Sequence, residues 1–102
     1  DYLEINGDFK ISYEIPRIIQ GKYKVFLGAE RYNTTNALVE VYIDGKKVSG
    51  LIDLSQGGTA NNPFQKIEIG TVDLKKYESH KVEVIPLIPG RFLWDYIRFE
   101  PI

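Results

Sequence analysis

The chain has 102 residues, of which 43% are hydrophobic and 13% aromatic, and this suits one globular domain with a modest core rather than two domains. Thirteen Lys and Arg residues against fourteen Asp and Glu residues give a formal net charge of -1, so the chain has no basic excess with which to hold nucleic acid phosphates. The absence of Cys excludes disulfides and thiolate metal sites, and a single His argues against zinc sites and His-based triads.

Seven or eight short segments have the period-two alternation or the β-branched composition of strands. Pro16 and Pro86 end two of them because proline has no amide to give to a ladder. Asp44-Gly45 predicts a tight hairpin turn, and residues 73–79 resemble one helical turn. In chain order, the predicted strands are residues 2–5 (a short edge strand), 9–15, 22–30, 39–43, 47–54, around 67–69, around 82–84, and 91–99.

The last predicted strand is apolar on both faces, which predicts a central strand that is covered on each side. Strict alternation assigns Asp95 to the face of Ile97. It assigns Trp94 to the opposite face, together with Phe92 and Tyr96. We expect Trp94 to belong to the core rather than to an exposed platform for a polysaccharide or a partner protein.

The regular spacing of these strands predicts an all-β sandwich or barrel that spans the whole chain as one domain, and we take an antiparallel two-sheet β-sandwich as the expected fold. If successive strands run antiparallel, their connections alternate between the two ends of the sandwich. The connections expected at one end are 32–37, 55–63 and 87–91, and those expected at the other are 16–21, 44–47 and 73–80.

Six short motifs follow one another along the chain: Ile11-Ser-Tyr-Glu-Ile-Pro16, Gly21-Lys-Tyr-Lys-Val-Phe26, Val41-Tyr-Ile-Asp-Gly45, Ile69-Gly-Thr-Val-Asp-Leu74, His80-Lys-Val-Glu-Val84 and Leu93-Trp-Asp-Tyr-Ile-Arg-Phe-Glu-Pro101. In this order the chain resembles the galactose-binding-domain-like β-sandwiches, which include family-six and related carbohydrate-binding modules. The resemblance implies a jelly roll that binds a glycan without catalysing a reaction.

The closing segment Phe92-Leu-Trp-Asp-Tyr-Ile-Arg-Phe-Glu-Pro101 also resembles the C-terminal sandwich domains of fasciclin-type surface lipoproteins of Bacteroidetes, which are thought to serve adhesion or glycan handling. This resemblance implies a location outside the cell or on its surface, with outer-membrane anchoring through a longer parent chain. The absence of Met and of a leader before Asp1 agrees with a piece of a longer protein. No apolar run approaches the ~20 residues that span a bilayer, so we expect no direct membrane insertion.

Sugar recognition needs an aromatic face for the ring together with donors and acceptors for its hydroxyls. The end that carries loops 32–37 and 87–91 has these groups. Tyr32 and Phe92 would stack on the ring, and the other members would bond hydroxyls; the structural alternative is that the Asn residues serve turn geometry and Tyr32 covers the sandwich edge. The expected ligand-binding residues are Glu30, Arg31, Tyr32, Asn33, Asn36, Arg91 and Phe92.

Two positions of the chain can be compared with those of the resembled sugar-binding families. The sugar-binding families often have an Asn before the last strand, whereas Pro89, Gly90 and Arg91 fill that stretch here. In the resembled modules an Asp at the position of Asp95 helps to hold a structural calcium with acidic residues of the first strand, where Glu4 stands. Because calcium takes six to eight oxygen ligands and the sequence offers no such set, we expect no cofactor and an Asp95 that accepts backbone amides.

The sequence therefore predicts a non-catalytic carbohydrate-binding or accessory module. The alternative is a structural or adhesion domain that packs on a neighbouring domain or protein and binds no sugar. The missing Asn favours this alternative, as do aromatic residues such as Phe26, Tyr42 and Trp94, which exceed what one sandwich can bury. We expect no enzymatic activity, because a small sandwich with short loops offers little enclosure for catalysis.

Overall fold

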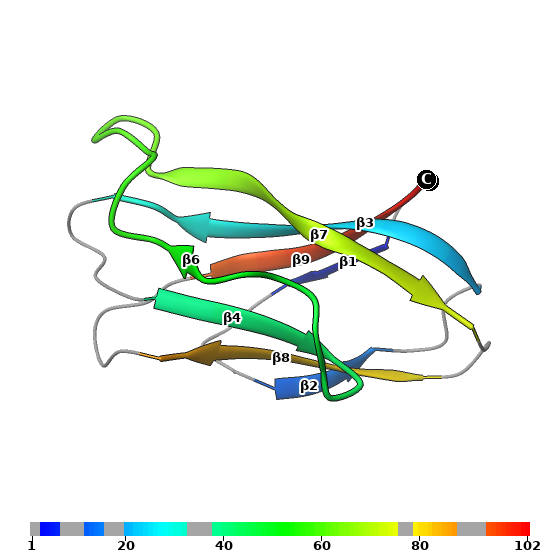
Figure 1. The fold of residues 1–102 in the computed structure, drawn as a ribbon. Helices are drawn as coiled ribbons and strands as arrows, with labels where there is room; N and C mark the ends of the chain where they lie inside the picture. The colour runs from blue at the N-terminus through cyan, green and yellow to red at the C-terminus, as the bar shows by residue number, and fades with distance from the viewer. Residues whose placement is uncertain (1–2, 7–11, 16–19, 33–37, 76–78, 88–93) are drawn as a thin grey trace.

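The computed structural model describes residues 3–6, 12–15, 20–32, 38–75, 79–87 and 94–102, and this part of the chain consists of strands and loops without a helix (Figure 1). The all-β class predicted from the sequence is therefore confirmed. The strands are β1 (Leu3–Asn6), β2 (Ser12–Ile15), β3 (Gly21–Glu30), β4 (Leu38–Ile43), β5 (Lys46–Lys47), β6 (Ile52–Asp53), β7 (Phe64–Leu74), β8 (His80–Pro86) and β9 (Trp94–Pro101).

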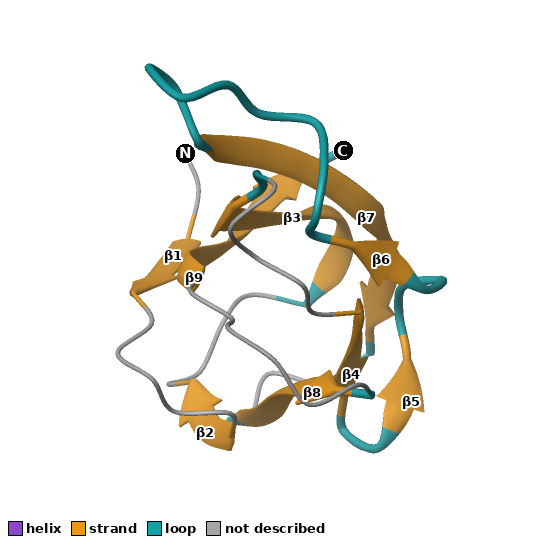
Figure 2. Cartoon of the chain, turned by 90° about the vertical axis from the view of Figure 1, so that its left-hand side faces the viewer, coloured by secondary structure: helices purple, strands orange, loops and turns teal. Residues whose placement is uncertain are grey.

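Two antiparallel sheets face each other, which confirms the predicted sandwich (Figure 2). One sheet has the order β1-β9-β3-β7, and the other has the order β2-β8-β4-β5, with β6 also paired to β4. The first strand thus pairs with the last, β2 pairs with β8, and β3 pairs with β7. As predicted, β9 is central, because it lies between β1 and β3.

The core lies between the two sheets and is built from the inward side of each alternating strand. In β3, Val25, Leu27 and Ala29 are completely buried, and in β8 the core members are Val82 and Val84. Burying a side chain such as Val or Leu contributes about 1.5–3 kcal/mol, so this face supplies much of the drive to form the sandwich. The other buried apolar residues are Val39, Val41, Ile43, Ile52, Leu54, Leu74, Trp94, Ile97 and Phe99.

A β-bulge in β9 changes the faces that alternation predicts. Gly28 is opposite Tyr96 and Ala29 is opposite Trp94, so Asp95 is an extra residue without a partner on β3. Trp94 is 6% exposed and shares the core with Ile97, whereas Asp95 is exposed. The prediction that Trp94 is a core residue is confirmed, while the assignment of Asp95 to the face of Ile97 is wrong.

A second bulge lies in the middle of β7. Val25 is opposite Gly70 and Phe26 is opposite Glu68, which leaves Ile69 as the extra residue. At this point β7 approaches the backbone of the other sheet, because a Cβ on Gly70 would overlap with the carbonyl oxygen of Val48. The glycine is therefore needed where β7 meets the backbone of Val48.

The predicted strand over residues 47–54 is interrupted in the structure. It forms two short pieces, β5 and β6, which pair with opposite ends of β4. Between them, the Val41 amide donates to the hydroxyl of Ser49 at 2.9 Å, so a side chain takes the place of a ladder carbonyl. Ser49 is buried, which accounts for a polar residue in this segment.

Other predicted boundaries shift by a few residues. Strand β7 starts at Phe64 and ends at Leu74, so residues 73 and 74 are strand rather than the start of a helical turn. Residues 76–78 of that predicted turn, residues 9–11 of the second predicted strand and residues 91–93 of the last one lie outside the described residues. The predicted edge strand at 2–5 corresponds to β1, which pairs only with β9 among the described strands.

The predicted grouping of connections at two ends is confirmed for the described parts. At the end that we call the loop end, the Tyr32 amide donates to the Leu54 carbonyl and the Gly58 amide donates to the Arg31 carbonyl. At the opposite end, which we call the hairpin end, the Asp44 amide donates to the Lys81 carbonyl. In Figure 1 the loop end is on the left and the hairpin end is on the right.

Candidate functional site

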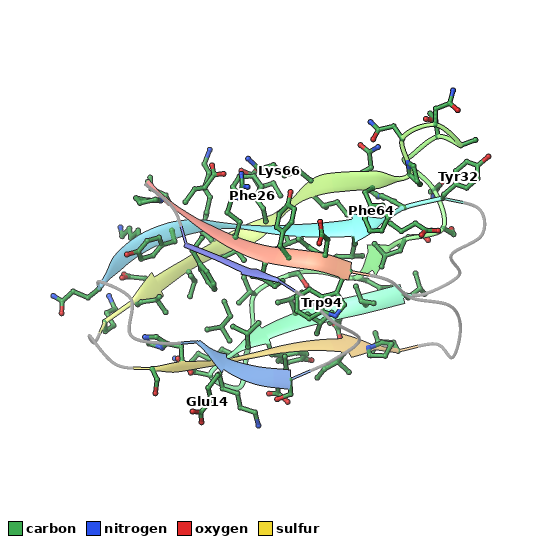
Figure 3. The ribbon with its side chains drawn as sticks, turned by 180° about the vertical axis from the view of Figure 1, so that it is seen from behind. Glu14, Phe26, Tyr32, Phe64, Lys66 and Trp94 are labelled. Carbon is green, nitrogen blue, oxygen red and sulfur yellow. The ribbon has the colours of Figure 1, made fainter. Side chains whose placement is uncertain are left out.

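The outer face of the four-stranded sheet carries aromatic and charged side chains in adjacent rows. Gly28 of β3 lies between Tyr96 of β9 and Lys66 of β7, and Phe26 lies between Arg98 and Glu68 in the next row. Because Leu27 and Ile97 point into the core, these neighbours point outward. Figure 3 labels Phe26 and Lys66 on this side of the sheet, away from the core Trp94.

A shallow pocket of about 260 Å³ opens on this face near the loop end. The ring of Tyr96 rests directly against Gly28, where any Cβ would overlap with it. The absence of a side chain on Gly28 therefore makes room for the ring, and Phe64 is 46% exposed beside it. The pocket is lined by Gly28, Phe64, Gln65, Lys66, Asp95 and Tyr96.

Ion pairs and ring contacts hold the charged groups of this face in place. The Lys66 ammonium lies 4.2 Å from the centre of the Phe26 ring and 2.8 Å from Glu100 Oε2. This hydrogen bond to Lys66 is the main reason why the pKa of Glu100 is lowered from its ordinary value. The Arg98 guanidinium lies 5.2 Å from the centre of the Tyr96 ring. The face therefore combines fixed charges with flat apolar surfaces.

The bulge in β9 supplies the carboxylate of the pocket. Asp95 is exposed and lines the pocket next to Tyr96, because the extra residue turns it away from the core. Gln65 contributes an amide whose Nε2 donates to the Asn62 carbonyl at 2.7 Å. Acidic, amide and ammonium groups thus surround two aromatic rings within one small depression.

At the loop end, the predicted site residues that the structure describes have structural contacts. Glu30, the last residue of β3, is 7% exposed. The Arg31 side chain donates from Nε to the Asp53 carbonyl at 3.1 Å, and its backbone amide donates to the Pro63 carbonyl. Tyr32 is partly buried. Arg31 therefore attaches the connection between β6 and β7 to the end of β3.

The side chains of that connection also bond one another. The Asp53 carboxylate accepts hydrogen bonds from the Ser55 hydroxyl at 2.6 Å, from the Ser55 amide at 2.9 Å and from Gln56 Nε2 at 3.3 Å. The Ser55 hydroxyl and then its amide lower the pKa of Asp53. A turn closed between Thr59 and Asn62 completes the segment. Many polar groups here serve the loop itself.

Some of the predicted site residues lie at the loop end, and others lie outside the described residues. Tyr32 lies at the same end as Phe64, as Figure 3 shows, and Glu30 is the ladder partner of Phe64. Asn33, Asn36, Arg91 and Phe92 lie outside the described residues.

The sequence prediction missed the residues of the outer face, namely Phe64, Gln65, Lys66 and Tyr96. A signal for two of them exists, because Phe64, Lys66 and Glu68 have the same parity and alternate with Ile67 and Ile69. That alternation indicates a strand whose outward side begins with an aromatic ring.

Among the described residues, no group of three or more His, Cys, Asp or Glu residues is arranged to hold a metal ion. Asp95, for which the resemblance implied a calcium ligand and for which we expected bonds to backbone amides, lines the pocket on the outer face, and the side chain of Glu4 is not described. The described segments also contain no helix that is long and apolar enough to cross a membrane.

No protein-family model and no curated protein matches the chain. Among solved structures, the insecticidal crystal protein Cry2Aa is similar, with a TM-score of 0.60 and 20% sequence identity over 88% of this chain. The match covers 15% of the Cry2Aa chain, so the present chain corresponds to a small part of that protein. At this identity the similarity concerns the fold alone, and it agrees with the two-sheet β architecture.

Proposed function

We propose that this chain is a non-catalytic module that binds carbohydrate on the outer face of its four-stranded sheet. The observation that carries the proposal is the shallow pocket in which Phe64 and Tyr96 lie beside Gln65, Lys66 and Asp95. Its volume of about 260 Å³ is somewhat below the ~300–1,000 Å³ of drug-sized ligand sites, which suits one sugar unit of a longer glycan.

The chemistry of the pocket matches that of a sugar ring. The apolar C–H face of the ring would pack on Phe64 and Tyr96, and its hydroxyls would donate to the Asp95 carboxylate and accept from the Lys66 ammonium. Because Lys66 is already positioned by Glu100 and Phe26, little side-chain entropy remains to be lost on binding. The lack of deep enclosure supports binding rather than catalysis.

The binding residues expected from the sequence would extend this pocket. Tyr32 lies at the same end of the sandwich as Phe64. Asn33 and Asn36 follow Tyr32 in the chain, and Arg91 and Phe92 precede β9. In our proposal a glycan runs from the pocket toward these loops.

We further propose that the sandwich is a jelly roll of the galactose-binding-domain type. The support is the nested pairing of strands, first with last and second with second-last, which divides the chain between two sheets as two Greek keys do. The sequence resemblance alone supports a place for the module on a bacterial cell surface, within a longer lipoprotein.

The test is a glycan array followed by calorimetric titration of the whole chain with the best neutral and acidic oligosaccharides. We expect saturable binding, and Phe64→Ala should weaken it about tenfold, since removing an aromatic contact costs of the order of 1–2 kcal/mol. Tyr32→Ala should weaken binding of longer oligosaccharides only.

Leu51→Ala is the matched control, because Leu51 is 58% exposed and Phe64 is 46% exposed, and Leu51 lies between β5 and β6 of the other sheet, outside the loops toward which the glycan would run. Its affinity should equal that of the unmodified chain. Absence of saturable binding on the array and in the titration, or equal affinity of the Phe64→Ala variant, would refute the proposal.

The second candidate is a structural or adhesion domain that packs on a neighbouring domain and binds no sugar. Exposed Leu51, Phe64, Leu87 and Ile102 favour it. Against it, Trp94 is buried and Phe26 is contacted by Lys66, so the described aromatic residues are better covered than their number suggests. This candidate would gain support if glycans fail to bind while Leu51→Ser and Leu87→Ser weaken attachment to the adjoining domain.

A further inference from the structure

A second pocket, of about 380 Å³, lies at the hairpin end, on the opposite end of the sandwich from the proposed carbohydrate pocket. Its walls come from both sheets. The segment from Ile43 to Val48 contributes one side, the last residues of β7 contribute the other, and His80 stands at the start of β8. Gly70 lets β7 reach the carbonyl of Val48 beside this pocket, so the two sheets meet at its border.

His80 is held in one orientation by the hairpin turn. It is 4% exposed and shares the core-facing parity of Val82. Its Nδ1 lies 2.5 Å from Asp44 Oδ2, while Asp44 Oδ1 accepts the Lys81 amide at 2.9 Å. A carboxylate can only accept, so Nδ1 carries the hydrogen, and in the neutral imidazole Nε2 is then an acceptor.

This acceptor is not satisfied within the described part of the chain. His80 Nε2 is buried and has no hydrogen-bond partner among the described residues. Buried polar atoms are nearly always hydrogen-bonded, because leaving one unpaired costs about 1–3 kcal/mol. A donor from outside the protein would remove this cost.

The lysines that line the pocket differ in their ion pairs. Lys75 lies 2.7 Å from Asp73 and Lys47 is paired with Glu40, while the Asp44 carboxylate accepts the hydrogen bond from His80 Nδ1. Within the described residues, Lys46 has no such partner, although it lines the pocket. The pocket therefore combines a buried acceptor with an unpaired cation, and its lining also includes Val48 and Val72.

We infer that this hairpin-end pocket binds a small hydroxylated carboxylic acid of the size of a sugar acid. A ligand hydroxyl donates to His80 Nε2, the ligand carboxylate pairs with the Lys46 ammonium, and the C–H face of the ligand packs on the valines. The inference does not depend on the proposed carbohydrate pocket, because the two share no lining residue.

The experiment is a titration of the ¹⁵N-labelled whole chain with sodium glucuronate, followed by amide NMR spectra. We expect saturable shifts confined to residues 43–48, 71–75 and 79–81. Glucose has the hydroxyls without the carboxylate and acetate has the carboxylate without the hydroxyls, so each should bind at least tenfold more weakly than glucuronate. Imidazole ¹⁵N spectra should show the Nε2 resonance of His80 moving on binding while Nδ1 stays in place.

Lys46→Ala removes an exposed cation of β5 without touching the core, and it should weaken glucuronate binding at least tenfold. Lys24→Ala is the matched control, because Lys24 is an exposed cation of β3 that lines neither pocket, and its affinity should be unchanged. The His80→Gln variant should also bind glucuronate more weakly. If that variant fails to fold, the comparison of Lys46→Ala with Lys24→Ala still tests the inference.

Three results would each overturn the inference. The first is the absence of a saturable shift with glucuronate, which would mean that only water bonds to His80 Nε2. The second is a Lys46→Ala variant that binds glucuronate as tightly as the Lys24→Ala control. Shifts that map to Phe64 and Lys66 would assign the ligand to the carbohydrate pocket, thereby supporting the proposed function and rejecting the hairpin-end site.

Discussion

The two ends of the sandwich use their polar residues in different ways. At the loop end, Arg31, Asp53 and Ser55 bond to one another or to nearby backbone, so much of their hydrogen-bonding capacity is taken up in holding the connection. At the hairpin end, the buried His80 bonds to Asp44 through one nitrogen and presents a second nitrogen without a partner among the described residues.

The number of polar residues is therefore a poor guide to a binding site. The loop end is the richer in amides and hydroxyls, yet those that the structure describes largely stabilise the loop. A site is better indicated by hydrogen-bonding capacity that folding leaves unused.

Substitutions in the core beneath the loop end should lower the free energy of unfolding the most. Trp94→Ala removes a side chain that is 6% exposed, and it should lower the free energy of unfolding by about 3–5 kcal/mol. Asp95→Ala, one residue along, should change it by less than about 0.5 kcal/mol, because the bulge exposes Asp95. Urea denaturation measures both values. Similar losses for the two variants would mean that β9 lacks the bulge.

At the hairpin end, Asp44→Asn keeps a residue that tolerates the positive φ of 53° but removes one of two acceptors. His80 Nδ1 and the Lys81 amide then compete for one oxygen, so unfolding should become easier by about 1–3 kcal/mol. Lys46→Ala in the same turn should stay within about 0.5 kcal/mol. If Asp44→Asn is as stable as Lys46→Ala, the His80 orientation is not set by Asp44.

Arg31→Ala should release the loop end without affecting the hairpin end. The loss of the bond to the Asp53 carbonyl should cost about 0.5–1.5 kcal/mol. Hydrogen exchange should become faster at the amides of Tyr32 and Gly58, while the amide of Lys81 keeps its rate. Equal acceleration at both ends would show that they unfold as one unit.

The smallest effect expected is a change in the pH dependence of stability. Because hydrogen bonds from Ser55 lower the pKa of Asp53 in the folded state, this carboxylate stabilises the fold above its unfolded pKa. That contribution is lost as the pH falls through the folded pKa. Thermal unfolding between pH 7 and pH 2 should therefore show a gap between the unmodified chain and Asp53→Asn that narrows below about pH 4. A constant gap would contradict the assignment.

Much of the fold could be predicted from period-two alternation. In β3, the residues Val25, Leu27 and Ala29 alternate with polar neighbours, and the structure buries all three. The antiparallel order of strands then predicted which connections share an end. These predictions succeed because side-chain direction in a strand depends on residue spacing alone.

The bulges could not be predicted in the same way. One inserted residue reverses the parity of the strand beyond it, and Ile69 is of a type that regular strands favour. The break after β5 also depends on a tertiary contact, in which the Ser49 hydroxyl replaces a ladder carbonyl. Both features are set by the partner strand, which the local sequence does not reveal.

The candidate sites could be predicted only in part. The sequence predicted a strand around residues 82–84, but the pairing of His80 with Asp44 spans 36 residues and requires the fold. The outer-face pocket likewise joins β3, β7 and β9, which are distant in the chain. Tyr96 reaches the pocket because Gly28 has no side chain, and such a complementary pair becomes evident only once the strands are aligned.

The bulge at Ile69 has a consequence for how this molecule behaves in concentrated solution. Strand β7 has 11 residues and lies at one edge of its sheet, so a regular β7 would present a long row of unpaired backbone groups to another copy of the chain. The bulge interrupts that row at its centre, and exposed Lys66, Glu68 and Asp73 add charge along the strand. The bulge and the charges together thus protect the protein against edge-to-edge aggregation.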